Sequence, residues 1–404
     1  MEEELPGEGS FIPRKWEEPL QFLIDQIVDL KLTFEEASRS LNTLGKDESA
    51  VRYAYLMLTA TDRKLTDISV IVNFSHLQFV DLSGNYLTLE ALQVLSQLPY
   101  LLYIRAERNR IESAGLNPMH FLQVLIFNKN SIRETGEICQ PILETLELAD
   151  NFIYTVQFDA ERLENLKELV LSGNHLLDTS GTYPKNLEKL FMGKNKIIRI
   201  NSDLVQLKKL KYLHLRDNNI RKLTGFSETL ENLTYLNLRS NNINKVRQLR
   251  KLNCLPKLET LIVLDNPFYK RDMKRKEEED AGEDKTTDYT DTTTEVTDKT
   301  EYYGEGGPPP APPVDVLRVR ILALLPNLKR LNKDFVTLDE QEVVESTRQS
   351  LLDEIFEEES SEDDTDVATT TSYTTDFTTE TDFGEQVLEQ EEQIDLKTVE
   401  FADM

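Results

Sequence analysis

Cysteine and histidine are scarce in this chain of 404 residues. Its two cysteines, Cys139 and Cys254, stand five units apart in the repeat described below, which is too far for a disulfide, and small disulfide-stapled domains need more of them. The four histidines show no His-x-x-x-His spacing and no Cys-x-x-Cys pair accompanies them. The sequence therefore predicts no metal site and no cofactor.

Long apolar runs are also missing. No stretch approaches the roughly 18 apolar residues that span a bilayer, and the acidic start Met1–Pro6 lacks the basic and apolar regions of a signal peptide. No Gly-x-Ser-x-Gly elbow occurs, and the glycines of 304–307 precede prolines instead of following a strand. We expect an intracellular protein that is not an enzyme and has neither a membrane nor a small molecule as partner.

The formal charge of −27 is concentrated in two segments. Residues 357–404 hold 17 acids and one lysine, and residues 271–315 hold 14 acids and six bases, which leaves −3 for everything else. Both segments are rich in threonine and poor in apolar residues, so we expect them to be disordered. Their threonines fit either acid-directed phosphorylation or a plain solvated tether. The remaining body has no broad basic face, which argues against a nucleic-acid partner.

What the chain does contain is the pattern Leu-x-x-Leu-x-Leu-x-x-Asn, which recurs nine times at intervals of 21 to 25 residues, with another apolar residue in place of a leucine in some copies. This is a leucine-rich-repeat period. It predicts an α/β solenoid of the class with repeats of about 22 residues, with a curved parallel sheet on the concave side, short helices or 3₁₀ turns on the convex side, and helical caps. The leucines face the core, and the closing asparagines form a structural ladder that bonds buried backbone groups: Asn85, Asn109, Asn130, Asn151, Asn174, Asn195, Asn218, Asn241 and Asn266.

The pattern divides the chain into an N-terminal extension (1–31), a helical cap (32–54), the repeats (55–270), a disordered acidic Thr/Pro-rich insertion (271–315), a C-terminal cap (316–336), a helix (337–358) and a disordered acidic tail (359–404). Thr33–Glu36 is a capping box, which predicts a helix from there to about Leu44 that stops at Gly45. A degenerate first rung, 55–63, begins the stack. The insertion lies between the two halves of one cap, so we expect it to loop out without breaking the stack.

Outward positions of the strands form the concave face, and aromatic and arginine residues among them favour binding hot spots. We predict that a partner binds the second half of this face through Phe191, Tyr212, His214, Arg216, Tyr235 and Arg239. The alternative is that strands favour aromatics for cross-strand packing whether or not anything binds. Ile262 and Leu264 point the same way, and we expect the cap or the helix that begins near Thr337 to cover them.

Several stretches resemble a known family, the leucine-rich repeat-containing protein 23 family of radial spoke components in motile cilia and flagella. The similarity runs from about Leu32 to about Val344, and it is carried by residues 65–68, 76–83, 213–218, 223–227, 235–239 and 258–267. His214, Arg216 and Asp217 are not framework positions of the repeat, so their likeness exceeds leucine periodicity. The acidic insertion at 271–315 and the acidic C-terminal tail depart from the family pattern.

The resemblance implies a non-enzymatic scaffold of the axoneme, a cytoskeletal protein of the cilium or flagellum that contacts other radial spoke proteins and is needed for ciliary or sperm motility. An alternative is a leucine-rich-repeat regulatory subunit of protein phosphatase 1 or a similar intracellular adaptor. Arg318–Ile321 loosely matches a phosphatase-docking tetrapeptide, but it falls in a predicted cap helix and ends in isoleucine. A splicing-type adaptor is a third class, and the missing basic element argues against it.

Overall fold

A computed structural model describes residues 30–46, 51–271 and 315–360. The chain divides into two units, 1–361 and 362–404, and all the described residues belong to the first. The strands are β1 (Leu41–Lys46), β2 (Tyr53–Thr59), β3 (Phe79–Asp81), β4 (Tyr103–Arg105), β5 (Val124–Ile126), β6 (Thr145–Glu147), β7 (Val156–Gln157), β8 (Glu168–Val170), β9 (Gly181–Thr182), β10 (Lys189–Phe191), β11 (Tyr212–His214), β12 (Tyr235–Asn237), β13 (Thr260–Ile262), β14 (Arg330–Leu331) and β15 (Asp334–Phe335). The helices are α2 (Phe34–Arg39), α3 (Leu89–Leu92), α5 (Val316–Leu324) and α6 (Leu338–Ser360), with 3₁₀ helices η1 (Ser69–Asn73), η2 (Gln93–Gln97), η3 (Ser202–Gln206) and η4 (Val246–Cys254).

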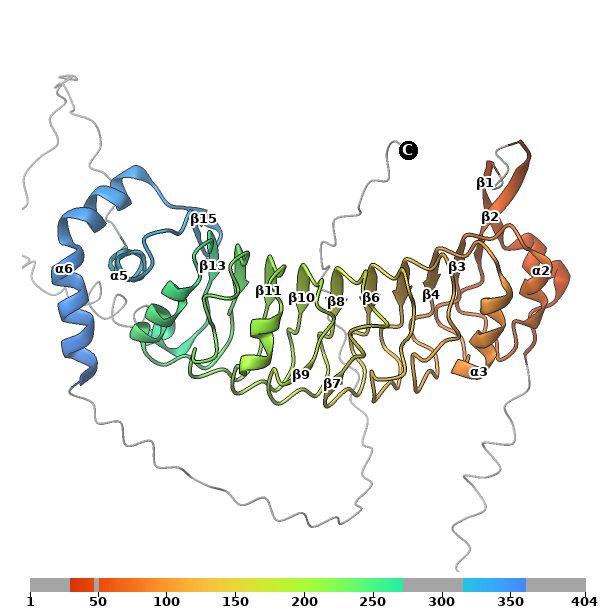
Figure 1. The fold of residues 1–404 in the computed structure, drawn as a ribbon, viewed down its shortest axis with the longest axis horizontal. Coiled ribbons are helices and arrows are strands. Elements are labelled where there is room, and N and C mark those ends of the chain that lie inside the picture. The colour runs from red at the N-terminus through yellow and green to blue at the C-terminus, as the bar shows by residue number, and fades with distance from the viewer. Residues whose placement is uncertain (1–29, 47–50, 272–314, 361–404) are drawn as a thin grey trace, which may run out of the picture. The chain divides into compact units, whose positions relative to one another are not determined.

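One sheet of 13 strands runs through the described residues, and its strands line the concave side of the repeat body (Figure 1). From β2 to β14 every neighbouring pair is parallel, and antiparallel pairs close the two ends. The predicted fold class, an α/β leucine-rich-repeat solenoid, is confirmed. Each strand is only two or three residues long between the ends because the chain must turn inward after every outward-facing strand.

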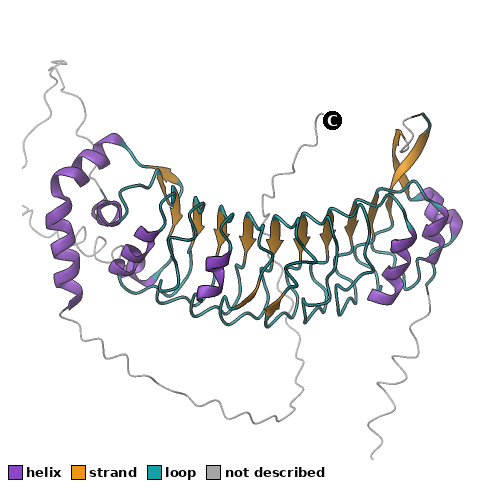
Figure 2. Ribbon diagram, viewed as in Figure 1, coloured by secondary structure: helices purple, strands orange, loops and turns teal. Residues whose placement is uncertain are grey.

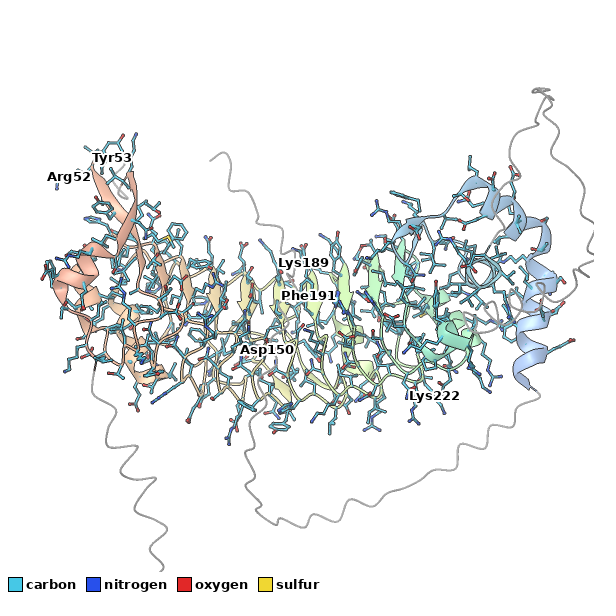
Figure 3. The ribbon with its side chains drawn as sticks, turned by 180° about the vertical axis from the view of Figure 1, so that it is seen from behind. Arg52, Tyr53, Asp150, Lys189, Phe191 and Lys222 are labelled. Carbon is cyan, nitrogen blue, oxygen red and sulfur yellow. The ribbon has the colours of Figure 1, made fainter. Side chains whose placement is uncertain are left out.

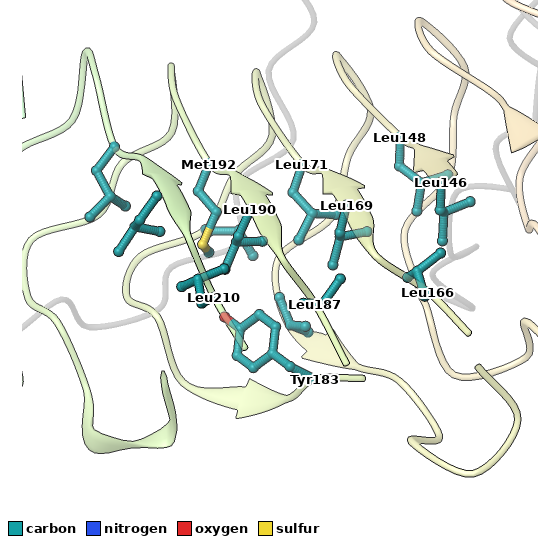
Figure 4. Close-up of a cluster of buried hydrophobic side chains, with 14 of the residues drawn as sticks. Leu146, Leu148, Leu166, Leu169, Leu171, Tyr183, Leu187, Leu190, Met192 and Leu210 are labelled. Carbon is teal, nitrogen blue, oxygen red and sulfur yellow. The ribbon is translucent and has the colours of Figure 1, made fainter. Parts of the chain in front are cut away.

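The core is a column of aliphatic side chains between the strands and the return arms (Figure 4). In successive strands Leu146, Leu169 and Leu190 are fully buried and lie in register, since β6, β8 and β10 pair residue by residue. Tyr183 enters the same column, where its hydroxyl donates to the Thr179 carbonyl over 3.1 Å. Because each rung contributes similar side chains at the same positions, every rung packs on the next in the same way.

All nine ladder asparagines are buried and bonded to backbone. Asn174 is representative: its Nδ2 donates to the carbonyls of Leu148 and Leu171 at 2.9 and 3.0 Å, while its Oδ1 accepts from the Ile153 amide at 3.0 Å. One side chain thus satisfies backbone groups of two neighbouring rungs that the turn leaves buried.

The return arms on the convex side contain less helix than the sequence pattern predicts (Figure 2). The 3₁₀ helices η1, η2, η3 and η4 occupy some of them, but the arms that follow Asn109, Asn130, Asn151, Asn174 and Asn218 are turns without helix. The two-stranded sheet of β7 and β9 takes the place of helix in two arms. These arms complete the rung as turns without a helix, because packing against the core holds them in place and helical hydrogen bonds are not needed.

The prediction for the N-terminal cap is wrong in part. The capping box exists, with Glu36 and Thr33 bonded reciprocally, but the helix it opens ends at Arg39 and does not reach Leu44. Residues 41–46 form β1, an antiparallel partner of β2. The reason is tertiary: the first strand of the stack has an unpaired edge, and pairing along that edge outweighs the local helical pattern. The degenerate first rung does begin the stack, since Met57 of β2 pairs with Phe79 of β3.

At the other end the sheet crosses the acidic insertion without interruption. Thr260 and Leu261 of β13 pair with Arg330 and Leu331 of β14, although about seventy residues of chain separate them. Asn332, which follows Leu331 at the position next to Ile262, accepts from the Val263 amide over 3.0 Å and so ties the last strand to the rung before it. The insertion expected at 271–315 lies outside the described residues except for its two ends, as do the N-terminal extension up to residue 29 and the tail from 361.

Two helices cover this end. The helix predicted at 337–358 is α6, which begins with a capping box of Thr337 and Glu340. It packs on α5 and η4, burying Val344 and Ile355, and Arg348 donates to the Ala323 carbonyl. Arg318 joins the two helices by an ion pair with Glu340 in which both side chains are 13% exposed. None of the described helices is long and apolar enough to cross a membrane.

Candidate partner-binding surface

The parallel register turns outward residues of successive strands into rows on the concave face. Lys189, Tyr212 and Tyr235 form one row, and Phe191, His214 and Asn237 form the next. These rows collect four of the six residues predicted to bind a partner. The other two, Arg216 and Arg239, follow their strands by two residues and continue the same surface.

The aromatic rings of this surface contact one another. The ring centroids of Tyr212 and Tyr235 are 5.7 Å apart, those of His214 and Tyr235 are 6.4 Å apart with nearly parallel planes, and those of Phe191 and His214 are 5.9 Å apart. Tyr212 remains 43% exposed. The concave face of β10, β11 and β12 therefore presents an aromatic platform, on the side where Figure 3 labels Lys189 and Phe191.

The two arginines are held by neighbouring acids. Arg216 Nε lies 3.0 Å from a carboxylate oxygen of Asp217, and Arg239 Nε lies 2.6 Å from one of Asp265. Both pairs are partly exposed, so they order the arginine planes more than they stabilise the fold. The platform offers fixed guanidinium groups beside rings, a combination common in binding hot spots.

Asn237 belongs to this surface and was missed in the sequence. Its side chain is buried, its Oδ1 accepts from the Arg239 amide at 3.0 Å, and its Nδ2 lies 2.9 Å from Nε2 of His214. Because an amide NH₂ only donates, His214 Nε2 must accept, which leaves the proton on Nδ1. The available signal was its outward strand position, which is the position of His214 in the preceding rung.

Burial lowers the pKa of the His214 imidazole, and the positive charge of Arg216 lowers it further, while the negative charge of Asp217 opposes them. The surroundings therefore favour the neutral form of the ring. A neutral ring stacked on Tyr235 acts as a flat, weakly polar contact and not as a charge.

The first half of the concave face holds a smaller cluster. Phe79 and Tyr103 approach to 6.2 Å between ring centroids, and Arg105 pairs with Glu107 at 2.9 Å. Further along, Asn128 donates to Glu147 over 2.7 Å, and burial raises the pKa of that carboxyl. This half is acidic where the second half is aromatic and basic.

At the end of the concave face, the apolar side chains of Ile262 and Leu264 are partly buried. Leu264 lines a cavity of about 210 Å³ together with Tyr269 and with Ile321 and Leu331 of the C-terminal cap. Residues of the cap thus share this cavity with Leu264. Its volume is below the range usual for ligand sites.

Metal chemistry finds no support in the described ranges. They contain no group of three or more His, Cys, Asp or Glu side chains that could hold an ion. Cys139 and Cys254 are free thiols.

A continuous parallel sheet of short strands, sealed by an asparagine ladder and capped at both ends, defines a leucine-rich-repeat protein. The leucine-rich-repeat family matches residues 164–220, and a second form of the repeat matches 229–246. Such repeats mediate protein–protein interaction, and the chain is an interaction scaffold of this kind.

Individual proteins are similar to this chain over most of its length. Leucine-rich repeat-containing protein 23 of Homo sapiens is 32% identical over 80% of this chain and 81% of its own. The protein of the same name from Mus musculus is 35% identical over 78% and 79%. The chain belongs to the leucine-rich repeat-containing protein 23 family.

Solved structures match the repeats more loosely. The functional domain of InlJ from Listeria monocytogenes aligns with a TM-score of 0.40 at 24% identity, over 53% of this chain and 45% of that one. A chain from the octameric complex of Latrophilin 3, Unc5D and FLRT2 aligns with a TM-score of 0.42 at 19% identity, over 57% and 79%.

Proposed function

We propose that this protein is a non-enzymatic scaffold of the axoneme in motile cilia or flagella, a component of the radial spoke that is needed for ciliary or sperm motility. Its partners are other radial spoke proteins, bound through the concave platform of Phe191, Tyr212, His214 and Tyr235 with Arg216 and Arg239. The proposed location is the cytoplasm and its cytoskeleton. Family membership supports the proposal, together with the implication that the sequence resemblance carries.

The aromatic platform is the observation that supports this binding site. Three adjacent strands bring aromatic rings and two oriented arginines onto one exposed surface, and Asn237 on the adjacent strand fixes the ring of His214 from the side. Cross-strand packing alone does not require that Tyr212 stay 43% exposed or that arginines flank the rings. Preformed side chains lose little entropy on binding, which favours affinity.

The structure argues against the tetrapeptide Arg318–Ile321 as a phosphatase-docking site. Val319 and Ile321, the apolar residues of the loosely matching tetrapeptide, are 5% and 0% exposed within α5. A docking peptide must offer these side chains to a partner, and here they fill the C-terminal cap. Their burial argues against that function.

The test uses the full chain and axonemes stripped by salt. We expect the wild-type chain to bind them, and the double variant Tyr212→Ala with Arg216→Ala to weaken binding at least about tenfold, because it removes an exposed ring of the platform and one of the arginines that flank the rings. Thr145→Ala changes an outward residue of β6 away from the platform and is the matched control. Binding that persists in a folded double variant rejects the concave site, whereas phosphatase recovered from non-ciliated cells in place of axonemal binding rejects the spoke assignment.

A further inference from the structure

A second surface lies where the chain leaves each ladder asparagine. From Asn109 to Asn241, side chains one and three residues after the ladder asparagine are partly or fully exposed, and backbone hydrogen bonds hold these positions beside each other from rung to rung. The amide of His175 donates to the Ile153 carbonyl at 2.9 Å, and that of Lys196 donates to the Leu176 carbonyl at 3.0 Å. Asp178 and Arg199 form a parallel bridge one step further along.

Apolar residues occupy these positions in three consecutive rungs. Tyr154, Leu177 and Ile198 are 59%, 59% and 53% exposed, and they lie three residues after Asn151, Asn174 and Asn195. The ring of His175 lies 5.7 Å from Phe152 and 5.1 Å from Tyr154, between centroids. The repeat does not demand this, because the matching positions of the preceding rung are Ser131 and Arg133, and those of a later rung are Asn242 and Asn244.

Basic residues continue the same line. Lys196 and Arg221 are exposed and form no salt bridge with another described residue, while Arg199 lies beside Asp178 at 3.4 Å and Lys222 follows Arg221. We call Phe152, Tyr154, His175, Leu177 and Ile198, with these four basic residues, the outer ridge.

The repeats are nearly neutral as a whole, but their positive and negative residues are separated along the chain. Residues 185–271 carry 19 lysines and arginines against seven acids, a net +12, whereas residues 30–184 carry 13 against 20, a net −7. The basic end of the outer ridge lies within the positive half. A positive potential of this size attracts acidic groups and orients them before contact.

We propose that the outer ridge is a second docking surface, which binds an extended segment of another protein that carries apolar side chains next to acidic ones. The apolar side chains would cover Tyr154, Leu177 and Ile198, and the acids would pair with Lys196, Arg199 and Arg221. With neighbouring rungs about 4.8 Å apart, the ridge spans roughly 14 Å, the length of four or five residues of extended chain. Exposed aliphatic side chains interleaved with bases suit such a segment better than nucleic acid, whose backbone offers phosphates but no apolar side chains to cover Tyr154, Leu177 and Ile198.

The ridge and the concave platform are on different sides of the repeats. Figure 3 labels Lys222 on the convex side and Phe191 on the side of the strands. Both surfaces can therefore be occupied at once, and the chain would join two proteins. This inference does not depend on the proposed axonemal role.

The test measures fluorescence anisotropy of a labelled synthetic peptide in which leucines and a tyrosine precede a run of glutamates. We expect saturable binding to the full chain that weakens with added salt. Leu177→Ser and the pair Lys196→Glu with Arg221→Glu should each weaken affinity at least about tenfold, since they remove the apolar and the basic part of the ridge separately. The control is Arg133→Glu, an exposed residue at the matching position of another rung.

Exposed positions tolerate such changes, and circular dichroism melting verifies the fold of each variant. Four results would overturn the proposal: no saturable binding by the wild-type chain, unchanged affinity in the folded ridge variants, equal affinity for a peptide with glutamines in place of glutamates, or tighter binding of duplex DNA than of the peptide. Stronger peptide binding after removal of residues 361–404 would also overturn it, because the chain's own acidic tail and not a partner would then be the occupant.

Discussion

At the scale of single residues, position in the rung decides what an amide does. Asn218 is 6% exposed, donates to the carbonyls of Met192 and Leu215 at 2.9 and 3.0 Å, and accepts from the Ile197 amide at 3.0 Å. Its neighbour Asn219 has the same side chain but is exposed. The two residues therefore separate the role of a buried amide from that of asparagine as such.

We predict that Asn218→Ala lowers the free energy of unfolding by about 1 to 3 kcal/mol, because the backbone groups it satisfies stay buried without partners. Asn219→Ala should change it by less than about 0.5 kcal/mol. Urea denaturation followed by circular dichroism measures both. Equal stabilities of the two variants would show that the ladder contributes nothing.

At the scale of elements, the two ends of the stack are closed by different means. β1 covers the edge of β2 by antiparallel pairing, whereas α6 lies over α5 and η4 through apolar contacts. Within α6 the apolar stripe is unequal: Ile355 is fully buried, and Leu338 is 75% exposed. Arg250 also lies over the ring of Phe356, with 4.9 Å to its centroid. Contacts spread along α6, from the Arg318–Glu340 pair near its start to Ile355 and Phe356 near its end, hold it in place.

We predict that Ile355→Ala loosens α6 at a cost of about 2 to 5 kcal/mol, the usual range for removing a buried aliphatic side chain. Hydrogen exchange of the α6 amides should speed up accordingly, while the amides of β5 and β6 stay protected. Leu338→Ala in the same helix is the control and should leave exchange unchanged. A uniform loss of protection along the whole sheet would contradict local docking.

At the scale of the whole molecule, the final rung is assembled from distant parts of the chain. The Lys329 amide donates to the Glu259 carbonyl at 2.8 Å, and the Lys329 side chain pairs with that of Glu259. Tyr269 and Asp315, near the two ends of the insertion, line the same cavity. The chain thus leaves and re-enters the stack at one place, so the rung does not need the residues between.

We predict that replacing residues 272–314 by a short glycine-serine linker keeps the cooperative melting transition. The melting temperature should stay the same or rise slightly, since each halving of a flexible loop recovers about 0.6 kcal/mol of closure entropy. Differential scanning calorimetry makes the measurement. As a control, the wild-type chain cut by a protease within the insertion should also keep its fold. Loss of the transition in the linker variant would mean that the insertion is part of the core.

Much of the architecture could be predicted because the repeat is a local pattern with a physical purpose. The leucines and the nine asparagines recur at positions where only a buried apolar group or a buried amide serves, and the structure shows them there. The six predicted surface residues could be grouped by their equivalent places in successive rungs, and the parallel register brings them together. Whether they bind a partner stays a prediction.

Other features depended on contacts that no local pattern contains. Residues 41–46 became a strand because β2 offered an open edge, and Asn237 became part of the platform because the ring of His214 lies beside it. The outer ridge exists only because the fold brings residues from four rungs side by side. Periodic residues thus determined the solenoid and its ladder by themselves, since each rung meets the same burial requirement. The tertiary structure decided the ends and the surfaces, because there the partners of a residue come from distant parts of the chain.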